Sequence, residues 1–167
     1  MLLLIDADGL IKLHRAGVLT VVVSVFSCVI PQTVHHEVVT VGKERLYQDA
    51  EAIEWILSDS VSILPVQVQE EPGLGLGAGE LGLMSLLNSV RDAVVVSDDR
   101  RFLAELRARG VQFLTPAHVV VALARRGVLT GEEAREALDR LRPAIRSAAY
   151  WEARQDLEAE GEPNEEK

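Results

Sequence analysis

The sequence contains few aromatic residues and a single cysteine. Aromatic residues make up only 4% of the 167-residue chain, so Leu, Val and Ala must build most of the core. Extended surfaces on which bases could stack are therefore not expected. Cys28 has no partner in the chain, which excludes an internal disulfide and a thiolate metal site. It lies in an apolar segment, where a small buried side chain is its expected role.

A targeting segment and a long apolar span are also missing. Residues 1–5 are apolar, but no basic residue precedes them and Asp6 ends the run, which is unlike a signal peptide. Residues 16–34 carry no charge, yet Pro31 and several hydroxyl side chains interrupt them, and their densest apolar part is too short to cross a bilayer. The sequence therefore predicts a soluble, cytoplasmic protein without membrane contact.

The charge is acidic and unevenly distributed. The formal net charge is −9, of which residues 152–167 carry −5. We expect a single domain over residues 1–150, followed over 151–167 by the end of a helix and a disordered acidic tail. An acidic body argues against broad, non-specific binding to nucleic acids.

Short apolar segments alternate with helical patterns along the chain. We expect strands at residues 2–5, 28–30, 61–68, 93–96 and 111–114. We expect helices at residues 9–15, 18–25, 31–41, 44–58, 80–90, 99–109, 116–126, 131–141 and 146–159, with Asp8 and Asp98 as caps of the first and sixth. Pro65 places the third strand at a sheet edge. The alternation predicts an α/β fold with a mostly parallel central sheet of four to five strands and additional C-terminal helices.

Acidic residues stand at the ends of several of these segments. Asp6 follows the first predicted strand, and Asp98 and Asp99 follow the fourth. Glu37 lies in a valine-rich helix, and Glu80 opens a helix after a glycine-rich run. The carboxyl ends of parallel strands meet at one sheet edge, where ligands bind. Carboxylates gathered there would repel one another and need a cation, for which oxygen ligands favour Mg²⁺ or Mn²⁺. Phosphodiester hydrolysis is a usual reaction of such sites.

These acids also have structural interpretations. An Asp after a strand can simply cap the next helix, and Glu80 can favour a helix N-terminus through the dipole. Glu37 is more informative, because an acid among valines on one helix face costs free energy unless something compensates it. The four histidines show no zinc-ligand spacing.

Residues 77–82 match the dinucleotide-binding fingerprint, with glycines at Gly77, Gly79 and Gly82. Two features oppose a nucleotide site. The glycines do not directly follow a strand, and Glu80 would place a negative charge beside the pyrophosphate. A nucleotide-binding enzyme stays an alternative, as does a binding or regulatory module with weak catalysis.

Four segments together resemble the motifs of the PIN domain family, compact α/β nucleases that include toxins of toxin–antitoxin pairs. They are LLLIDADGL at residues 2–10, VIPQTVHHE at 29–37, GAGELGL at 77–83 and VVVSDDRR at 94–101. The third is similar to a branch of the family with a Gly-x-Gly-Glu motif, whereas many relatives carry Asp where Glu80 stands. The resemblance implies an α/β/α sandwich, divalent-metal ribonuclease activity and frequent dimers.

Under this resemblance, one or two Mg²⁺ or Mn²⁺ ions are expected on Asp6, Glu37, Glu80, Asp98 and Asp99. Ser97 would orient the attacking water or a carboxylate. The expected phosphate contacts are Lys12, Arg15, Arg100 and Arg101. The expected partners are a single-stranded or structured RNA substrate, an antitoxin protein and a second copy of the chain.

Overall fold

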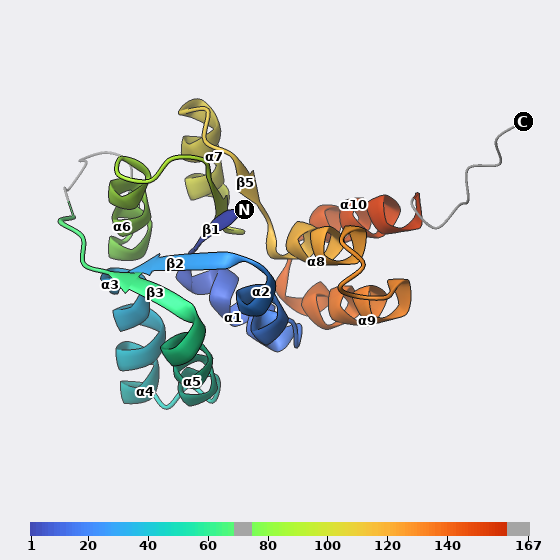
Figure 1. Cartoon of the computed structure of the whole chain (residues 1–167), viewed down its shortest axis with the longest axis horizontal. Helices are drawn as coiled ribbons and strands as arrows, with labels where there is room; N and C mark the ends of the chain where they lie inside the picture. Colours follow the sequence, from blue (N-terminus) through green and yellow to red (C-terminus); the bar gives the residue numbers. More distant parts are fainter. Residues whose placement is uncertain (69–74, 160–167) are drawn as a thin grey trace, which may run out of the picture.

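The computed structural model describes residues 1–68 and 75–159. Its centre is a sheet of five parallel strands in the order β3-β2-β1-β4-β5 (Figure 1). The strands are β1 (Leu2–Ile5), β2 (Ser27–Pro31), β3 (Val61–Leu64), β4 (Ala93–Val96) and β5 (Phe113–Leu114). The predicted α/β fold with a parallel sheet is confirmed, and β3 is an edge strand that ends before Pro65.

Helices cover both faces of the sheet. On one face lie α1 (Ala7–Arg15), α2 (Leu19–Val25) and α5 (Ala50–Ser60), and on the other lie α6 (Ala78–Leu87) and α7 (Arg100–Ala108) (Figure 1). The chain builds outward from β1 to β3 on one side, then returns to add β4 and β5 on the other. The direction of the strand order therefore reverses between β1 and β4, which is where open α/β sheets bind ligands.

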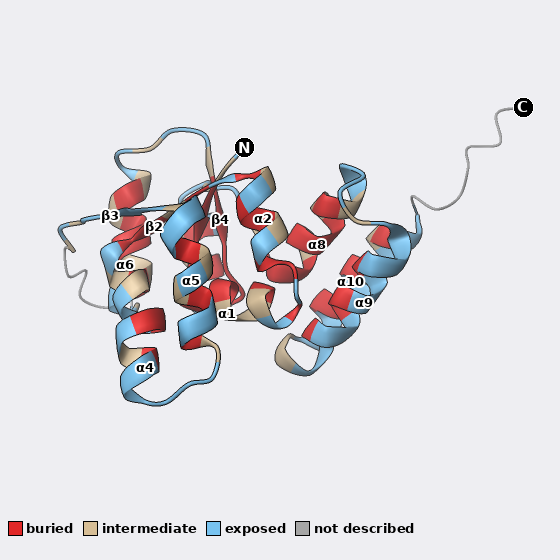
Figure 2. Cartoon of the chain, turned by 60° about the horizontal axis from the view of Figure 1, so that its bottom comes forward, coloured by how far each residue is buried: buried red, intermediate tan, exposed pale blue. Residues whose placement is uncertain are grey.

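Burial explains why the central strands form. Leu3, Leu4 and Ile5 of β1 and Val95 and Val96 of β4 are completely buried. Figure 2 shows the buried residues gathered in the sheet and on the inner sides of the helices. Short apolar strands covered on both faces are typical of parallel sheets.

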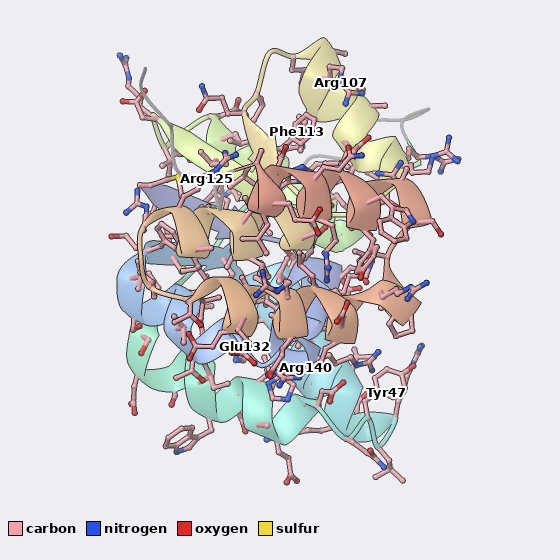
Figure 3. All side chains as sticks on the ribbon, turned by 90° about the vertical axis from the view of Figure 1, so that its right-hand side faces the viewer. Tyr47, Arg107, Phe113, Arg125, Glu132 and Arg140 are labelled. Atoms are coloured by element: carbon pink, nitrogen blue, oxygen red, sulfur yellow. The ribbon has the colours of Figure 1, made fainter. Side chains whose placement is uncertain are left out.

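The C-terminal part of the chain forms a helical layer beside the sheet. It contains α8 (Pro116–Arg125), α9 (Gly131–Leu141), a 3₁₀ turn (Arg142–Ala144) and α10 (Ser147–Glu158). These helices pack on one another, and α8 and α9 also contact α1. Figure 3 looks onto them, and the labelled Arg140 of α9 donates a hydrogen bond of 3.2 Å to the carbonyl of Ala16, just after α1.

Two predicted helix caps were wrong, by two residues for α1 and by one residue for α7. Asp6, not Asp8, caps α1, because its Oδ1 accepts the Gly9 N–H at 2.5 Å. Asp99, not Asp98, caps α7, because its Oδ1 accepts the Phe102 N–H at 2.8 Å.

The region between β2 and β3 also differs from the prediction. The helix after Pro31 starts as α3 (Gln32–His35), widens into a π-helical segment (His36–Val41) and continues through α4 (Gly42–Glu44). Gly42 is helical and does not end this helix. Instead, a Cβ at Gly42 would lie 3.0 Å from the Ala50 Cβ, so this glycine permits close packing on α5. The helix predicted from Glu44 begins only at Ala50.

Parts of two predictions lie outside the described residues. These are residues 69–74 of the glycine-containing loop and residues 160–167 of the predicted acidic tail. Among the described residues, no helix has the length and apolar character needed to cross a bilayer.

Replacing Gly82 by Ala should destabilise the fold. A Cβ at this position in α6 would lie 2.2 Å from the Thr33 Oγ1 and 3.1 Å from Pro31, so α6 could not keep its approach to α3. We expect a loss of about 1–3 kcal/mol in the free energy of unfolding, measured by urea denaturation. Gly131→Ala is the matched control, because its Cβ would meet nothing closer than 3.6 Å. Equal stability of the two variants would contradict this account of the α3–α6 contact.

Candidate active site

The site lies at the carboxyl edge of the sheet, between β1 and β4. Ile5 pairs with Val96, so the residues that follow these two strands leave the sheet at the same level. The Asp6 N–H also donates to the Val96 carbonyl at 3.1 Å. Asp6 and Asp98, 92 positions apart in the chain, therefore meet where the strand order reverses.

A cleft with a volume of about 660 Å³ opens at this edge. Five of the acids singled out in the sequence line it, from four different parts of the fold: Asp6, Glu37, Glu80, Asp98 and Asp99. The remaining described lining residues are Ala7, Asp8, Lys12, Gly79, Arg100, Pro143, Ala144, Ile145 and Arg146. The structure thus brings together carboxylates that the chain keeps far apart.

Asp6 is the most deeply buried of these acids, with 4% of its surface exposed. Burial raises its pKa to about 7, although hydrogen bonds from Ser97 and from the Gly9 N–H act in the opposite direction. Ser97 is fully buried beside it. Ser97 thus contacts the carboxylate of Asp6, and its role in orienting a carboxylate or a water stays a prediction.

Asp98 forms an ion pair with Lys12. The Lys12 Nζ lies 2.8 Å from the Asp98 Oδ2 and 2.6 Å from the Asp8 Oδ2. Burial lowers the pKa of Lys12, but the hydrogen bonds and charges of both carboxylates outweigh it and hold the pKa above its ordinary value. The other oxygen of Asp98, Oδ1, is buried without a hydrogen-bond partner, and the Arg146 Nη2 stands 4.0 Å from it.

Glu37 and Glu80 come from neighbouring helical segments, the π-helical segment and α6. Glu37 as a whole residue is exposed, and the π-helical segment carries its carboxylate to the cleft. Its carboxylate is partly covered by Gly79, where a Cβ would lie 2.9 Å from Oε2. The partial burial of this carboxylate raises the pKa of Glu37, and the charges of Glu80 and Asp8 add to the increase. Glu80 accepts the Gly77 N–H at 2.7 Å and so also closes the N-terminus of α6.

Asp99 also lines the cleft, but it has a structural role as the N-cap of α7. It is exposed at the cleft, and its carboxylate caps α7 through the Phe102 N–H. Its own N–H donates to the Ser97 Oγ at 3.2 Å. The two adjacent aspartates therefore have different roles, because Asp98 is buried in the cleft and Asp99 caps α7.

Of the four basic residues predicted to contact phosphate, two line the cleft and two make other contacts. Lys12 and Arg100 line the cleft, as expected for phosphate contacts. Arg15 instead pairs with Asp49 at 2.7 Å, and Arg101 donates to the Gly75 carbonyl at 2.9 Å. Arg146, which no sequence pattern indicated, also reaches the cleft, from the start of α10. No local pattern marks it, since only the packing of the C-terminal helices places it there.

The donors fit a hard divalent cation, because they are carboxylate oxygens and one of them, the Asp98 Oδ1, is buried and unpartnered. Within residues 1–68 and 75–159, however, no three His, Cys, Asp or Glu side chains are gathered tightly enough to hold one ion. Two contacts account for this: Lys12 lies between Asp8 and Asp98, and the carboxylate of Glu80 turns back to Gly77.

The stability of the metal-free protein should fall as Asp6 ionises. The pKa of Asp6 in the folded chain is about 7, above its ordinary value of 3.8, so the folded state binds this proton more tightly than the unfolded state. Its contribution to the free energy of unfolding should be complete below about pH 4 and disappear as the pH rises to about 7. Urea midpoints in chelator at about pH 5 and 7.5 should therefore differ more for wild type than for Asp6→Asn. An identical pH dependence in both proteins would rule this out.

Comparison with known proteins agrees with the fold. The model of a family described as a PIN domain matches residues 2–152, which covers the sheet, the cleft and most of the C-terminal helices. No curated protein and no solved structure matches the chain. PIN domains have a nuclease-type fold and generally use divalent metals. The match extends over far more than half of the sequence, and the chain therefore belongs to the PIN domain family.

Proposed function

We propose that the protein is a divalent-metal-dependent endoribonuclease. The observation that carries this proposal is one cleft at the switch point of the sheet, lined by carboxylates that follow β1 and β4 and by others from α6 and the π-helical segment. Family membership supports a nuclease and suggests RNA as the substrate. The local chemistry agrees, since acidic ligands and cationic side chains share one cleft that is large enough for a nucleotide.

Asp6, Glu37, Glu80 and Asp98 would hold Mg²⁺ or Mn²⁺, with Asp99 able to add an outer contact. A bound ion would polarise the scissile phosphate and make water a stronger nucleophile at neutral pH. Ser97 and the Gly9 N–H fix the carboxylate of Asp6, as partners behind a metal ligand usually do. Burial disfavours the ionised form of Asp6, and a cation bound beside it would stabilise that form and lower its pKa.

Arg100 and Arg146 would bind the phosphates of the RNA, and Lys12, held between Asp8 and Asp98, would add positive charge near them. All three line the cleft, and they come from α1, α7 and the start of α10. Arg146 is half-exposed and has a long planar head, which suits a contact with two oxygens of one phosphate. This arrangement would place the scissile bond between the acids and the C-terminal helices.

Two alternative functions have less support. For a nucleotide-binding enzyme, Gly79 and Gly82 should leave room for a phosphate, but a Cβ at either glycine would instead meet Glu37 or Thr33. A binding module without catalysis does not explain why Asp6 and Asp98 are buried at one sheet edge. Action as a toxin controlled by an antitoxin, and assembly into a homodimer, stay predictions from the family resemblance.

Replacing Asp98 by Asn should abolish RNA cleavage while the protein stays folded. The amide keeps the shape of the side chain but removes the charge that would bind the metal. A loss of several kcal/mol of transition-state stabilisation corresponds to a fall of about 100-fold or more in the cleavage rate. The measurement is cleavage of a labelled single-stranded RNA with Mn²⁺ or Mg²⁺, with a chelator as the metal-free arm.

Asp59→Asn provides the matched control. Asp59 is exposed near the end of α5, immediately before β3 begins, and thus at the opposite edge of the sheet. This variant should cleave at the wild-type rate. If Asp98→Asn and wild type cleave equally, the activity belongs to another site or a contaminant, and the proposal fails. Activity that survives the chelator would count against the metal.

Arg146→Ala should weaken cleavage without weakening metal binding. A charge-assisted hydrogen bond to phosphate contributes about 1.5–3 kcal/mol, so kcat/KM should fall about tenfold or more. Arg146→Lys should recover part of the loss, and Arg135→Ala, on the exposed side of α9, should have no effect. Calorimetry with Mn²⁺ should give the same affinity for wild type and Arg146→Ala. A parallel loss of metal affinity would show that Arg146 acts by supporting Asp98 and not on the RNA.

A further inference from the structure

Lys12 occupies an unusual place for a lysine. Its side chain is only 12% exposed, and its ammonium group lies between carboxylates of two elements, Asp8 on α1 and Asp98 after β4. Lysine normally keeps its charged end in water, because an ammonium ion is strongly hydrated. Here the two carboxylate oxygens, at 2.6 and 2.8 Å, replace that hydration. The ammonium group of Lys12 thus occupies the place between two carboxylates where a bound cation could otherwise lie.

Charge balance in the cleft explains why a cation is needed there. Among the described residues, six acids line the cleft, against Lys12, Arg100 and Arg146. Of these three bases, Arg100 is exposed, and Arg146 approaches Asp98 no closer than 4.0 Å. Lys12 therefore carries most of the direct compensation. Removing its charge would leave Asp98, whose side chain is 4% exposed, without a close counter-ion.

The two oxygens of Asp98 have different environments. Oδ2 bonds to Lys12, while Oδ1 is buried and has no hydrogen-bond partner. An ionised oxygen in this state costs free energy that a bound cation would recover. In two-metal nucleases, a pair of ions acts as a clamp on the reacting phosphate. Asp98 resembles a carboxylate that bridges two such ions, because its Oδ2 contacts the ammonium group of Lys12 and its Oδ1 has no hydrogen-bond partner.

We propose that Lys12 takes the place of a second metal, so that the cleft binds one divalent ion, with the Asp98 Oδ1 among its ligands. This inference rests on the proposed function, because it concerns the same metal site. In this role Lys12 is a positioning residue for Asp98 and supplies a fixed positive charge near the phosphate. The arrangement differs from a two-ion clamp in that one of its charges belongs to the chain and cannot be removed by a chelator.

Isothermal titration calorimetry with Mn²⁺, on the chelator-treated full chain, tests this stoichiometry. Wild type should bind one ion, and Lys12→Met, which keeps the length of the side chain but not its charge, should bind two. Lys43→Met is the control for the loss of one positive charge, because Lys43 pairs with Glu54 on the protein surface and lies outside the cleft. It should bind one ion. Electron paramagnetic resonance of Mn²⁺ provides an independent count, because two neighbouring ions broaden each other's spectrum.

Each outcome decides between the proposals. Two ions in wild type would overturn the role of Lys12 and leave the nuclease proposal intact. One ion in both wild type and folded Lys12→Met would also overturn it. No Mn²⁺ bound to wild type would sink the proposed function, and this inference with it. Should Lys12→Met fail to fold, Lys12→Gln, which can still donate a hydrogen bond to the carboxylates, replaces it with the same expected count of two.

Discussion

The pairing of β1 with β4 is the constraint on which the site depends. It is a parallel contact between segments about 90 residues apart, and it aligns the ends of two buried strands. Asp6 and Asp98 follow those ends, so the fold forces two carboxylates into one buried region. Like charges there are unfavourable unless they are neutralised. Other contacts in the site compensate the charge of these two carboxylates.

The responses differ between the two acids. Asp6 is held by Ser97 and by the N-terminus of α1, yet burial still raises its pKa to about 7. Asp98 is held by the ammonium group of Lys12, and one of its oxygens stays unpaired. Both arrangements leave a buried carboxylate incompletely compensated in the metal-free site. Such local cost is common where a protein keeps a site ready for a ligand.

Glycine and the C-terminal helices complete the cleft. Gly79 and Gly82 allow α6 to approach α3 closely, which brings Glu80 to the same cleft as Glu37. On the opposite side, the turn before α10 supplies a wall and places Arg146 near Asp98. The helices after β5 thus contribute to the site as well as to the core.

Much of this could be predicted from the sequence. The strands at residues 2–5 and 93–96 are short, apolar and followed by Asp, and the structure contains both with those bounds. Asp6, Asp98 and Asp99 were predicted at the site because they follow such strands and parallel strands place their carboxyl ends together. Glu37 and Glu80 lie in helices, and a valine-rich face and a glycine-rich run marked them instead. Cap positions were less certain: Asp6 and Asp99, not Asp8 and Asp98, cap their helices, since two neighbouring Asp residues fit the same local pattern.

The sequence by itself determined the parallel α/β fold and the acids at its carboxyl edge, since both follow from local hydrophobic patterns. Only the tertiary structure decided how those acids are compensated. The contact of Lys12 with Asp98, the widening of the helix that exposes Glu37, and the approach of Arg146 all join segments distant in sequence or depend on packing between helices. No local pattern encodes such contacts, because their free energy depends on burial and neighbouring charges that exist only once the chain has folded.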